Sequence, residues 1–488
     1  MDKDRGKLLK NTKETILRRC KKEFDCHNYK GLYNALFLAG KYLYTFNLEF
    51  FDDNLEKYIR ALADNVVKAD DNYVCDDSVV FFDSLGLSNR GLSKIYIKAL
   101  LKLGMSLKYV TYSEHYLENS EIRDLIKKTN NTEVFYINRC YSSINVLYNI
   151  IKDAKCIFLY TYPEDIIALS AAYKAKGTKY LINFTDHAFW YGASILDYDI
   201  EFRDFGINVS LQERKIEEKK IIKLPYYPEI DDSIEFQGYP NSHMNSSNTV
   251  FSGGSVYKTL DKTLTYYKFI DKLMSQYENL FFWYAGYGNY SELEKLRDKY
   301  KGRFYITGER RDLFQVMRHS RIFLNTYPMI GGLMSQYAIC AGIPAMTLIS
   351  DDSETGVLLK SGESYFEYYD KSKFWKEMED LIEDDDYYKK RCQNSSKNDL
   401  IMKQGTFDEA IEKIVKGESN LFKYERKPLS FDYLRETYVQ RFNWEMYCKA
   451  VCKKNFYMAS VFWKYYFALA FIMWKKLLKA IIRRIKCK

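Results

Sequence analysis

Proline is scarce in this chain, with seven among 488 residues, and no repeat or low-complexity tract interrupts the sequence. These absences argue against long disordered segments. Cysteine occurs ten times, but there is no CxxC pair and no Cys/His cluster at the spacing of a zinc site. Cys448 and Cys452 are four residues apart, as on one face of a helix. We therefore expect no metal site, and reduced thiols as in a cytosolic protein.

The sequence also lacks a long apolar segment. Its first 24 residues are densely charged, so we expect no signal peptide. Near the other end, the uncharged run from Tyr465 to Trp474 is too short to span a membrane. A longer span beginning at Asn455 would place Lys464 inside the bilayer. The sequence predicts no spanning helix.

Acidic residues are absent from positions 449–488, which contain 11 Lys and Arg. Taking these 11 from the chain's 74 leaves 63 basic against 65 acidic residues, so the positive net charge of +9 is confined to the tail. A nearly neutral body disfavours a nucleic-acid-binding protein, which needs a basic face on its folded part. The charge instead indicates a partner for the tail alone.

What is present is a regular alternation of apolar runs with helical periodicity. Residues 1–75 show helical spacing, and short strand-like runs such as "SVVFFDSLG", "CIFLYTY" and "KYLINFT" then alternate with helices. After a polar break at 239–248 the alternation resumes with "TVFSGG", "NLFFWYAG", "RIFLN" and "PAMTLIS". This order predicts an α/β protein with two tandem Rossmann-like domains, at 76–240 and 241–420. An N-terminal helical region (1–75) and a C-terminal helix with an amphipathic tail (421–488) complete the expected organisation.

The segment "NTYPMIGGLMSQYAICAGIPAMT", residues 325–347, places two glycines at the start of a helix, just past a strand. Ligands of open parallel sheets bind at the carboxyl ends of the strands. A helix beginning there offers free N–H groups and a positive dipole end, which suit phosphate. Gly331 and Gly332 would let the backbone approach the anion closely, although a turn with a packing glycine would show the same pair.

Further motifs surround this segment: "FSGGSVYK", "FFWYAGYG", "ITGERRDLFQVMRHSRIFLNTYP" and "GGLMSQYAICAGIPAMTL". Together they make residues 249–348 resemble the nucleotide-sugar half of GT-B glycosyltransferases, in particular the O-GlcNAc transferase and bacterial polysaccharide group. The resemblance implies a nucleotide diphosphate sugar as donor, a UDP-sugar first, and no cofactor. It implies that Lys258 binds the donor diphosphate and that the helix start does so through Gly331, Gly332 and Leu333. Arg310 or Arg311 of the "GERRD" loop and Tyr327 complete the predicted donor site.

The sequence departs from many retaining members of this group, which carry two glutamates eight positions apart. The corresponding positions are Met329 and Tyr337, and neither side chain is a carboxylate. We therefore expect an inverting reaction, which needs a base for the acceptor hydroxyl. His187 in "LINFTDHAFWYG" follows a strand, and its ordinary pKa near ~6.5 suits this role. Asp186 is the second candidate base, although both residues could instead tie down a loop.

Two weaker motifs were weighed. The triplet "DYD" at 197–199 resembles a metal-binding DxD motif, but it belongs to a different architecture and we expect no metal there. Arg90 in "SNRGLS" lies at the expected cleft, where it could contact an acceptor or cap a helix. The four remaining histidines are expected to be bystanders.

The tail from residue 455 to 488 predicts a helix lying in the membrane interface. Apolar residues keep helical spacing there, interleaved with Lys and Arg, which attract anionic lipid. A helix packed on the body is the alternative. These features predict a glycosyltransferase on the cytoplasmic membrane face that acts on a lipid-linked or growing glycan in bacterial surface polysaccharide synthesis. A nucleotide-sugar epimerase and a non-catalytic sugar-nucleotide-binding module are the alternatives.

Overall fold

The computed structural model describes residues 2–69, 74–86, 92–116, 121–349, 367–396, 401–429, 442–452 and 458–486, and the statements below concern these residues. Internal contacts divide the chain into two compact units. The first comprises residues 1–224, 408–427 and 435–488, and the second comprises residues 225–407 and 428–434. The N-terminal helices and the C-terminal tail therefore both belong to the first unit. The finer division at residues 75, 240 and 420 stays a prediction.

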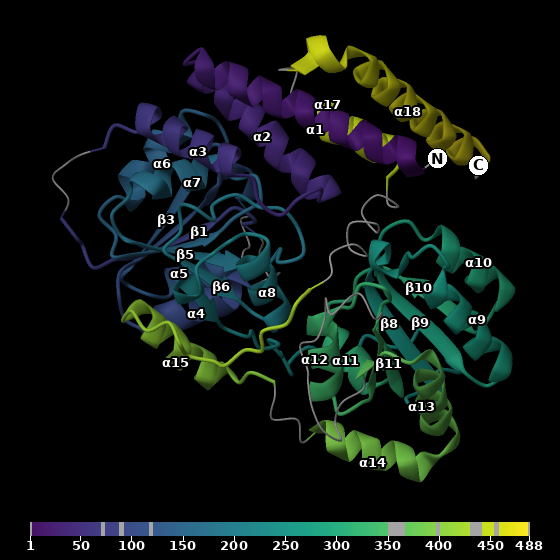
Figure 1. The fold of residues 1–488 in the computed structure, drawn as a ribbon. Helices are drawn as coiled ribbons and strands as arrows, with labels where there is room; N and C mark the ends of the chain where they lie inside the picture. The colour runs from purple at the N-terminus through teal and green to yellow at the C-terminus, as the bar shows by residue number, and fades with distance from the viewer. Residues whose placement is uncertain are drawn as a thin grey trace. The chain divides into compact units, whose positions relative to one another are not determined.

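The first unit contains a seven-stranded parallel sheet in the order β3-β2-β1-β4-β5-β6-β7 (Figure 1). Its strands are β1 (Val79–Asp83), β2 (Leu107–Tyr112), β3 (Thr132–Ile137), β4 (Cys156–Tyr160), β5 (Thr178–Asn183), β6 (Tyr198–Glu201) and β7 (Ile221–Lys223). The connecting helices are α4 (Ser93–Lys102), α5 (Glu121–Lys127), α6 (Ser143–Ile151), α7 (Ile166–Lys174) and α8 (Asp204–Gln212). Short 3₁₀ turns lie at η1 (Ser113–His115) and η2 (Glu218–Lys220).

All five residues of β1 are buried, as in a sheet covered on both faces. Val80 and Phe82 face the core that α6 and α7 cover, while Phe81 stacks against Tyr109 of β2. The strand order reverses between β1 and β4, which pair in register from Val79 opposite Cys156. Loops that leave these two strands therefore diverge at the carboxyl edge.

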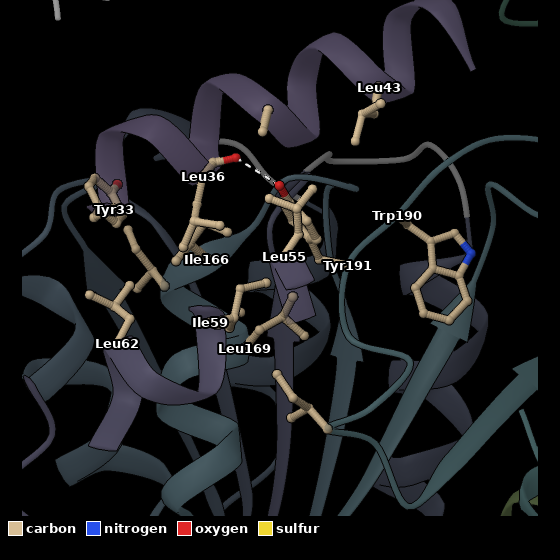
Figure 2. Close-up of a cluster of buried hydrophobic side chains, with 14 of the residues drawn as sticks. Tyr33, Leu36, Leu43, Leu55, Ile59, Leu62, Ile166, Leu169, Trp190 and Tyr191 are labelled. Carbon is tan, nitrogen blue, oxygen red and sulfur yellow. Dashed lines mark hydrogen bonds between the residues drawn. The ribbon is translucent and has the colours of Figure 1, made fainter. Parts of the chain in front are cut away.

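Three N-terminal helices extend the core of the first unit: α1 (Asp2–Asp25), α2 (Tyr29–Phe46) and α3 (Asp53–Val66). Asp52 begins α3 by accepting hydrogen bonds from the backbone N–H groups of residues 54 and 55. Figure 2 shows apolar side chains of α2 and α3 meeting Ile166 and Leu169 of α7. The Tyr191 hydroxyl donates to the backbone oxygen of Leu36 at 3.0 Å. These contacts attach α2 to the loop that follows β5.

The second unit contains a six-stranded parallel sheet in the order β10-β9-β8-β11-β12-β13. Its strands are β8 (Thr249–Ser255), β9 (Phe281–Tyr287), β10 (Phe304–Thr307), β11 (Ile322–Leu324), β12 (Ala345–Leu348) and β13 (Glu367–Tyr368). Its helices are α9 (Thr265–Gln276), α10 (Ser291–Lys299), α11 (Leu313–Arg318), α12 (Gly332–Cys340), α13 (Lys371–Glu383) and α14 (Asp385–Ser396), with a 3₁₀ turn η3 (Val256–Thr259). Figure 1 shows α9 and α10 on one side of this sheet and α11 and α12 on the other. Two separate hydrophobic clusters fill the two faces.

The polar segment 239–248, where the sequence placed the break between domains, is packed on the second unit. Met244 is buried in the cluster beneath α11 and α12, and the Tyr239 hydroxyl donates to the backbone oxygen of His319 at 2.9 Å. The contact boundary lies earlier, between Leu224 and Pro225.

The C-terminal part adds α15 (Gln404–Val415), α17 (Trp444–Cys452) and α18 (Ala459–Lys486). Of the C-terminal region expected at 421–488, residues 430–441 lie outside the described residues, and α17 is its first described helix. Cys448 and Cys452 are both buried on α17, and all nine cysteines among the described residues are free thiols. None of the described helices has the length and apolar character needed to cross a membrane.

Helix α18 has two different faces. Phe462 is buried at a break in the helix, and Tyr465 packs edge-on against Tyr447 of α17. The other face exposes large apolar side chains: Trp463, Phe467, Phe471 and Trp474 are 53–71% exposed. Their spacing of four, four and three residues places them in one stripe.

Candidate functional site

The second sheet reverses its strand order between β8 and β11, and two of the predicted donor segments follow these strands. Lys258 belongs to η3, which directly follows β8, while α12 follows β11. The backbone N–H of Met329 donates to the backbone oxygen of Lys258 at 3.2 Å. The structure therefore brings the two predicted phosphate-binding segments into contact at the carboxyl edge of the sheet, where ligands of open sheets bind.

Asn325, the first residue after β11, organises the start of α12. Its side-chain oxygen accepts hydrogen bonds from the backbone N–H groups of Thr326 and Gly331, both at 2.9 Å. Its amide nitrogen donates to Ser335 Oγ at 2.8 Å and to Thr347 Oγ1 at 3.2 Å. The buried side-chain amide of Asn325 therefore makes all four hydrogen bonds that it can form, two as acceptor and two as donor. The sequence interpretation missed Asn325, although a polar residue at the end of a buried strand was a visible signal.

The first turn of α12 presents free backbone donors. Gly331 is the N-cap residue and supplies no side-chain cap. Within the part of the chain that the structure describes, no acceptor is recorded for the N–H groups of Gly332, Leu333 and Met334. The side chain of Leu333 is 37% exposed. Three free N–H groups at the positive end of a helix are a site for an anion such as phosphate.

Two glycines near the carboxyl ends of β8 and β9 were not assigned by the resemblance. Gly254, near the end of β8, has a φ of +123°, a conformation that residues with a side chain rarely adopt. A Cβ at this position would meet no neighbouring atom, so the backbone conformation is what requires glycine. Its neighbour Gly286 in β9 has no room for a side chain, because a Cβ there would lie 1.9 Å from the Gly254 oxygen. The close approach of β8 and β9 thus depends on Gly286.

Two of the remaining predicted donor residues, Arg310 and Tyr327, are engaged inside the second unit. Arg310 makes a bidentate pair with Asp312, with donor–acceptor distances of 2.8 and 2.7 Å, and lies 5.2 Å from the Trp283 ring. Burial raises the pKa of Asp312, but the pairing outweighs it and lowers the pKa overall. Tyr327 is 8% exposed, and its ring belongs to the hydrophobic core. Arg311 is exposed on the same loop. Contact of these residues with a donor stays a prediction.

The two positions that carry glutamates in retaining relatives have other functions here. The Tyr337 hydroxyl donates to the backbone oxygen of Glu229 at 3.0 Å. The backbone oxygen of Met329 accepts from Thr326 Oγ1 at 2.6 Å. Both residues support the loop around α12 and offer no carboxylate to a ribose.

In the first unit, the loop after β5 carries His187 next to a buried ion pair. Arg203 binds Asp186 in a bidentate manner, with 2.8 Å between Nη2 and Oδ1. His187 Nδ1 lies 3.3 Å from the same Oδ1, and the His187 side chain is 23% exposed. Burial raises the pKa of Asp186, but Arg203 and His187 outweigh this effect and hold the pKa below its ordinary value. A buried, paired carboxylate of lowered pKa is a poor base, so Asp186 is better suited to orienting His187.

The backbone of this loop is fixed from two directions. The fully buried Arg214 donates from Nη2 to the backbone oxygens of Asp186 and Ala188, at 2.9 and 2.7 Å. Asn47, which ends α2 in the left-handed conformation, donates to the backbone oxygen of His187 at 3.0 Å. His187 is therefore a partly exposed imidazole on a rigid loop. Neither arginine follows from sequence spacing, because both lie far along the chain from the loop that they fix.

The "DYD" triplet has structural partners. Asp197 accepts a hydrogen bond from the Lys179 backbone N–H at 2.9 Å and pairs with its ammonium group at 3.0 Å. Asp199 is fully buried beside Glu201. No group of three potential metal-ligating side chains exists among the described residues. Arg90 lies outside the described residues.

The other histidines have local partners. His319 stacks on Phe236 with ring centroids 4.0 Å apart, and its Nδ1 lies 2.7 Å from the backbone oxygen of Gln315. His115 Nε2 lies 2.9 Å from the backbone oxygen of Ser84. His243 is exposed in a loop of the second unit, and His27 lies beside Tyr29.

Comparison with known proteins was informative only for structure. No family model matches the sequence, and no curated protein matches it. The fold is similar to that of the O-GlcNAc transferase of Thermobaculum terrenum, with a TM-score of 0.52 and 11% identity, over 84% of this chain and 78% of the other. It is also similar to HepE of Anabaena in complex with UDP and glucose, with a TM-score of 0.52 and 13% identity, over 70% of this chain and 100% of HepE. At this identity the similarity concerns the fold alone, and it confirms the prediction of an α/β protein with two Rossmann-like units.

Proposed function

We propose that this protein is a glycosyltransferase that moves a sugar from a nucleotide diphosphate donor to a glycan acceptor. A UDP-sugar is the first candidate for the donor. The observation that carries the proposal is the convergence of Lys258 with the N-terminus of α12 where β8 and β11 diverge. In the proposed site, the ammonium group of Lys258 and three backbone N–H groups of α12 bind the diphosphate. The similarity to HepE, whose structure contains UDP and glucose, supports the same ligand class.

In the proposed reaction, the acceptor oxygen forms a bond to the anomeric carbon while the bond to the nucleotide diphosphate breaks. His187 accepts the acceptor hydroxyl proton, and Asp186 orients its imidazole and stabilises the imidazolium that forms. Lys258 and the α12 N-terminus stabilise the charge that develops on the departing diphosphate. The absence of carboxylates at Met329 and Tyr337 supports inversion at the anomeric carbon.

The acceptor is proposed to be lipid-linked or a growing glycan at the cytoplasmic membrane face, as in bacterial surface polysaccharide synthesis. This part of the proposal rests on α18, whose exposed stripe of Trp463, Phe467, Phe471 and Trp474 lies beside Lys464 and Lys475. Aromatic side chains next to lysines suit the headgroup region of an anionic membrane.

The test of the donor site combines binding and turnover. UDP-glucose and related UDP-sugars are screened by thermal stabilisation, and UDP release is then measured with and without glycan acceptors. Lys258→Ala should slow UDP release by roughly 10²–10³-fold, as expected for one lost contact to the developing charge. Lys301→Ala is the matched control, because Lys301 is exposed on the connection before β10, at the opposite edge of the sheet. Unchanged turnover in Lys258→Ala would show that this lysine is not part of the donor site.

The same assay tests the base. His187→Ala should reduce transfer by roughly 10²–10⁴-fold and leave donor binding intact, whereas the exposed His243→Ala should behave as wild type. Transfer within a few-fold of wild type would make His187 structural. Release of an epimerised donor would identify an epimerase instead, and donor binding without any turnover would identify a non-catalytic module.

A further inference from the structure

Arg203 lies immediately before α8 and reaches back to the loop that carries His187. Its Nη2 donates to Asp186 Oδ1 at 2.8 Å, and its Nε donates to Asp186 Oδ2. His187 Nδ1 lies 3.3 Å from the same Oδ1. The contact from α2 is neutral, since Asn47 donates to the His187 backbone oxygen at 3.0 Å. One carboxylate oxygen therefore accepts from the guanidinium group and faces the imidazole at the same time.

The first turn of α8 is packed closely against this ion pair. A Cβ at Gly206 would lie 2.9 Å from the Asp186 Cβ and 2.1 Å from Glu201 Oε2. The side chain of Asp186 is 1% exposed and that of Arg203 is 11% exposed. Water is therefore largely excluded from the pair, and its two charges act on the neighbouring imidazole with little screening.

Other charged side chains near Asp186 come from β6 and from the segment after α8. Asp199 and Glu201 of β6 form a buried carboxyl pair, and burial raises the pKa of both groups. The single hydroxyl proton of Ser210 cannot be donated to both carboxyl groups that it contacts, so one of them is protonated. Arg214 is fully buried, and its positive charge opposes the rise of both pKa values. This second arginine therefore balances the single negative charge of the pair.

The charge of Asp186 then has Arg203 as its counterpart, and this affects His187. An imidazole beside a buried carboxylate without such a counterpart binds a proton more tightly, because the anion favours the imidazolium. Imidazolium cannot accept a proton from an acceptor hydroxyl. The contact at Nδ1 places the proton of a neutral imidazole on that nitrogen, since a carboxylate only accepts, and it leaves the lone pair on Nε2.

We propose that Arg203 is a positioning residue: it balances the charge of Asp186, so that Asp186 orients the His187 imidazole without converting it to imidazolium. The part of His187 as base rests on the proposed function. The charge balance itself concerns only residues of the first unit, and it is measured without a substrate.

The experiment follows the titration of His187 by NMR in the full-length protein. Isotope labelling of histidine gives one imidazole signal for each of the five histidines, and His187→Gln identifies the relevant signal. Arg203→Gln should move the midpoint of the His187 titration to higher pH by about one unit or more, the size of shift that one adjacent charge produces. Arg203→Lys keeps the positive charge and should recover part of the wild-type midpoint. Arg18→Gln is the matched control and should leave it unchanged, because Arg18 is exposed on α1 and donates to Thr15 of the same helix.

A double variant decides the question if loss of Arg203 alone prevents folding. Asp186→Asn leaves the Arg203 cation beside His187 and should move the midpoint to lower pH. Combining it with Arg203→Gln replaces the ion pair by two neutral amides, so that no unpaired charge stays buried. The midpoint of this double variant should lie closer to that of wild type than to that of Asp186→Asn. Equal midpoints in the double variant and Asp186→Asn would overturn the charge balance, as would a wild-type midpoint in folded Arg203→Gln.

Transfer activity reports separately on the base. If His187 is the base, transfer is lost as the pH falls through its titration, so Arg203→Gln should move this acidic limb of the pH–rate profile upward by the same interval. A shifted titration with an unshifted limb would support the charge balance and refute His187 as the base. A shifted titration in a protein that transfers no sugar at any pH would support the charge balance and refute the proposed transferase.

Discussion

At the scale of single residues, a buried pair of carboxyl groups lies beside the loop that carries His187. Ser210 Oγ is 2.8 Å from Asp199 Oδ2 and 2.7 Å from Glu201 Oε1. A hydroxyl has one proton to donate, so the second contact requires a proton on one of the carboxyl groups. Burial raises the pKa of Asp199 to about 6, and burial together with the Asp199 charge raises the pKa of Glu201. The pair therefore holds a proton at pH values where exposed carboxyl groups have lost theirs.

This pair makes the stability of the first unit depend on pH in a defined direction. Unfolding returns Asp199 to its ordinary pKa of 3.8, so between that value and about 6 the folded protein binds more protons than the unfolded chain. Protonated Asp199 therefore raises the free energy of unfolding below pH 4, and this stabilisation is lost as the pH rises through about 6. Asp199→Asn removes the titrating group, so its melting temperature relative to wild type should rise between pH 4 and pH 7.

Asp197→Asn is the control for this effect, because Asp197 is 44% exposed and paired with Lys179 on the same strand connection. Its melting temperature is measured beside those of Asp199→Asn and wild type, so that the effect of removing a carboxylate from the surface of the same unit is known. If the melting temperatures of Asp199→Asn and wild type differed by the same amount at every pH from 4 to 7, the pair would hold no extra proton.

Single residues also mark the limit of what the sequence could predict about the site. Lys258 and the glycines at 331 and 332 could be proposed from the sequence because contiguous motifs carry them, and their contact with a donor stays a prediction. Arg203 could not, because it contacts Asp186 only through the fold, from the residue before α8.

At the scale of elements, the start of α12 depends on one side chain outside the helix. Asn325→Ala would leave the backbone N–H groups of Thr326 and Gly331 without their acceptor in a buried region. Each unsatisfied buried group costs about 1–3 kcal/mol. We expect the free energy of unfolding to fall by about 2–4 kcal/mol and the affinity for UDP to fall as well, because the α12 N-terminus loses its position. Chemical denaturation and UDP titration measure the two effects.

Asn325→Asp separates the two functions of this side chain, since it keeps the acceptor and loses the donors to Ser335 and Thr347. It should retain more stability than the alanine variant, but its negative charge near the proposed diphosphate site should weaken UDP binding further. If UDP bound equally well to wild type and both variants, the α12 N-terminus would not be part of the donor site.

Regular elements were predictable where local pattern and tertiary environment agree. The strands β1, β4, β5, β8, β9 and β12 are apolar runs buried on both faces, and they lie where the sequence placed them. The elements β6, β7 and α8 were missed. Strand β6 contains buried Asp199 and Glu201, whose charges mask the apolar pattern of a strand. Strand β13 has two residues, too few for any periodicity.

At the scale of the whole molecule, the basic residues are concentrated in the C-terminal tail, and this concentration predicts that the tail binds an anionic membrane surface. The 11 basic residues after position 448 have no acidic neighbours in that segment, while the body carries 63 basic and 65 acidic residues. The structure adds that α18 uses one face to pack on α17 and exposes the stripe from Trp463 to Trp474 on another. Packing on the body, the alternative given for the tail, is therefore observed for one face of α18, and membrane binding by its exposed face stays a prediction.

Full-length protein should sediment with vesicles containing phosphatidylglycerol and more weakly with phosphatidylcholine vesicles. Each Lys or Arg near an anionic surface contributes about 1 kcal/mol, and salt screens this attraction because the Debye length falls from about 10 Å at 0.1 M to about 3 Å at 1 M. Part of the bound protein should therefore be released at high salt, and the remainder is held by the apolar stripe. Replacing Phe467, Phe471 and Trp474 with serine should abolish this salt-resistant fraction. Tyr116→Ser, which changes an exposed aromatic residue elsewhere in the first unit, should not.

Substitution is the better test than deletion of the tail, because Met458 and Phe462 are buried against the first unit and their removal would expose its core. The serine variant should keep the melting temperature of wild type, since the three replaced side chains are more than half exposed. Sedimentation of the variant at wild-type levels in high salt would assign vesicle binding to another surface. Extraction by detergent alone, with the C-terminus protected from protease added on the cytoplasmic side, would instead show that the segment crosses the membrane.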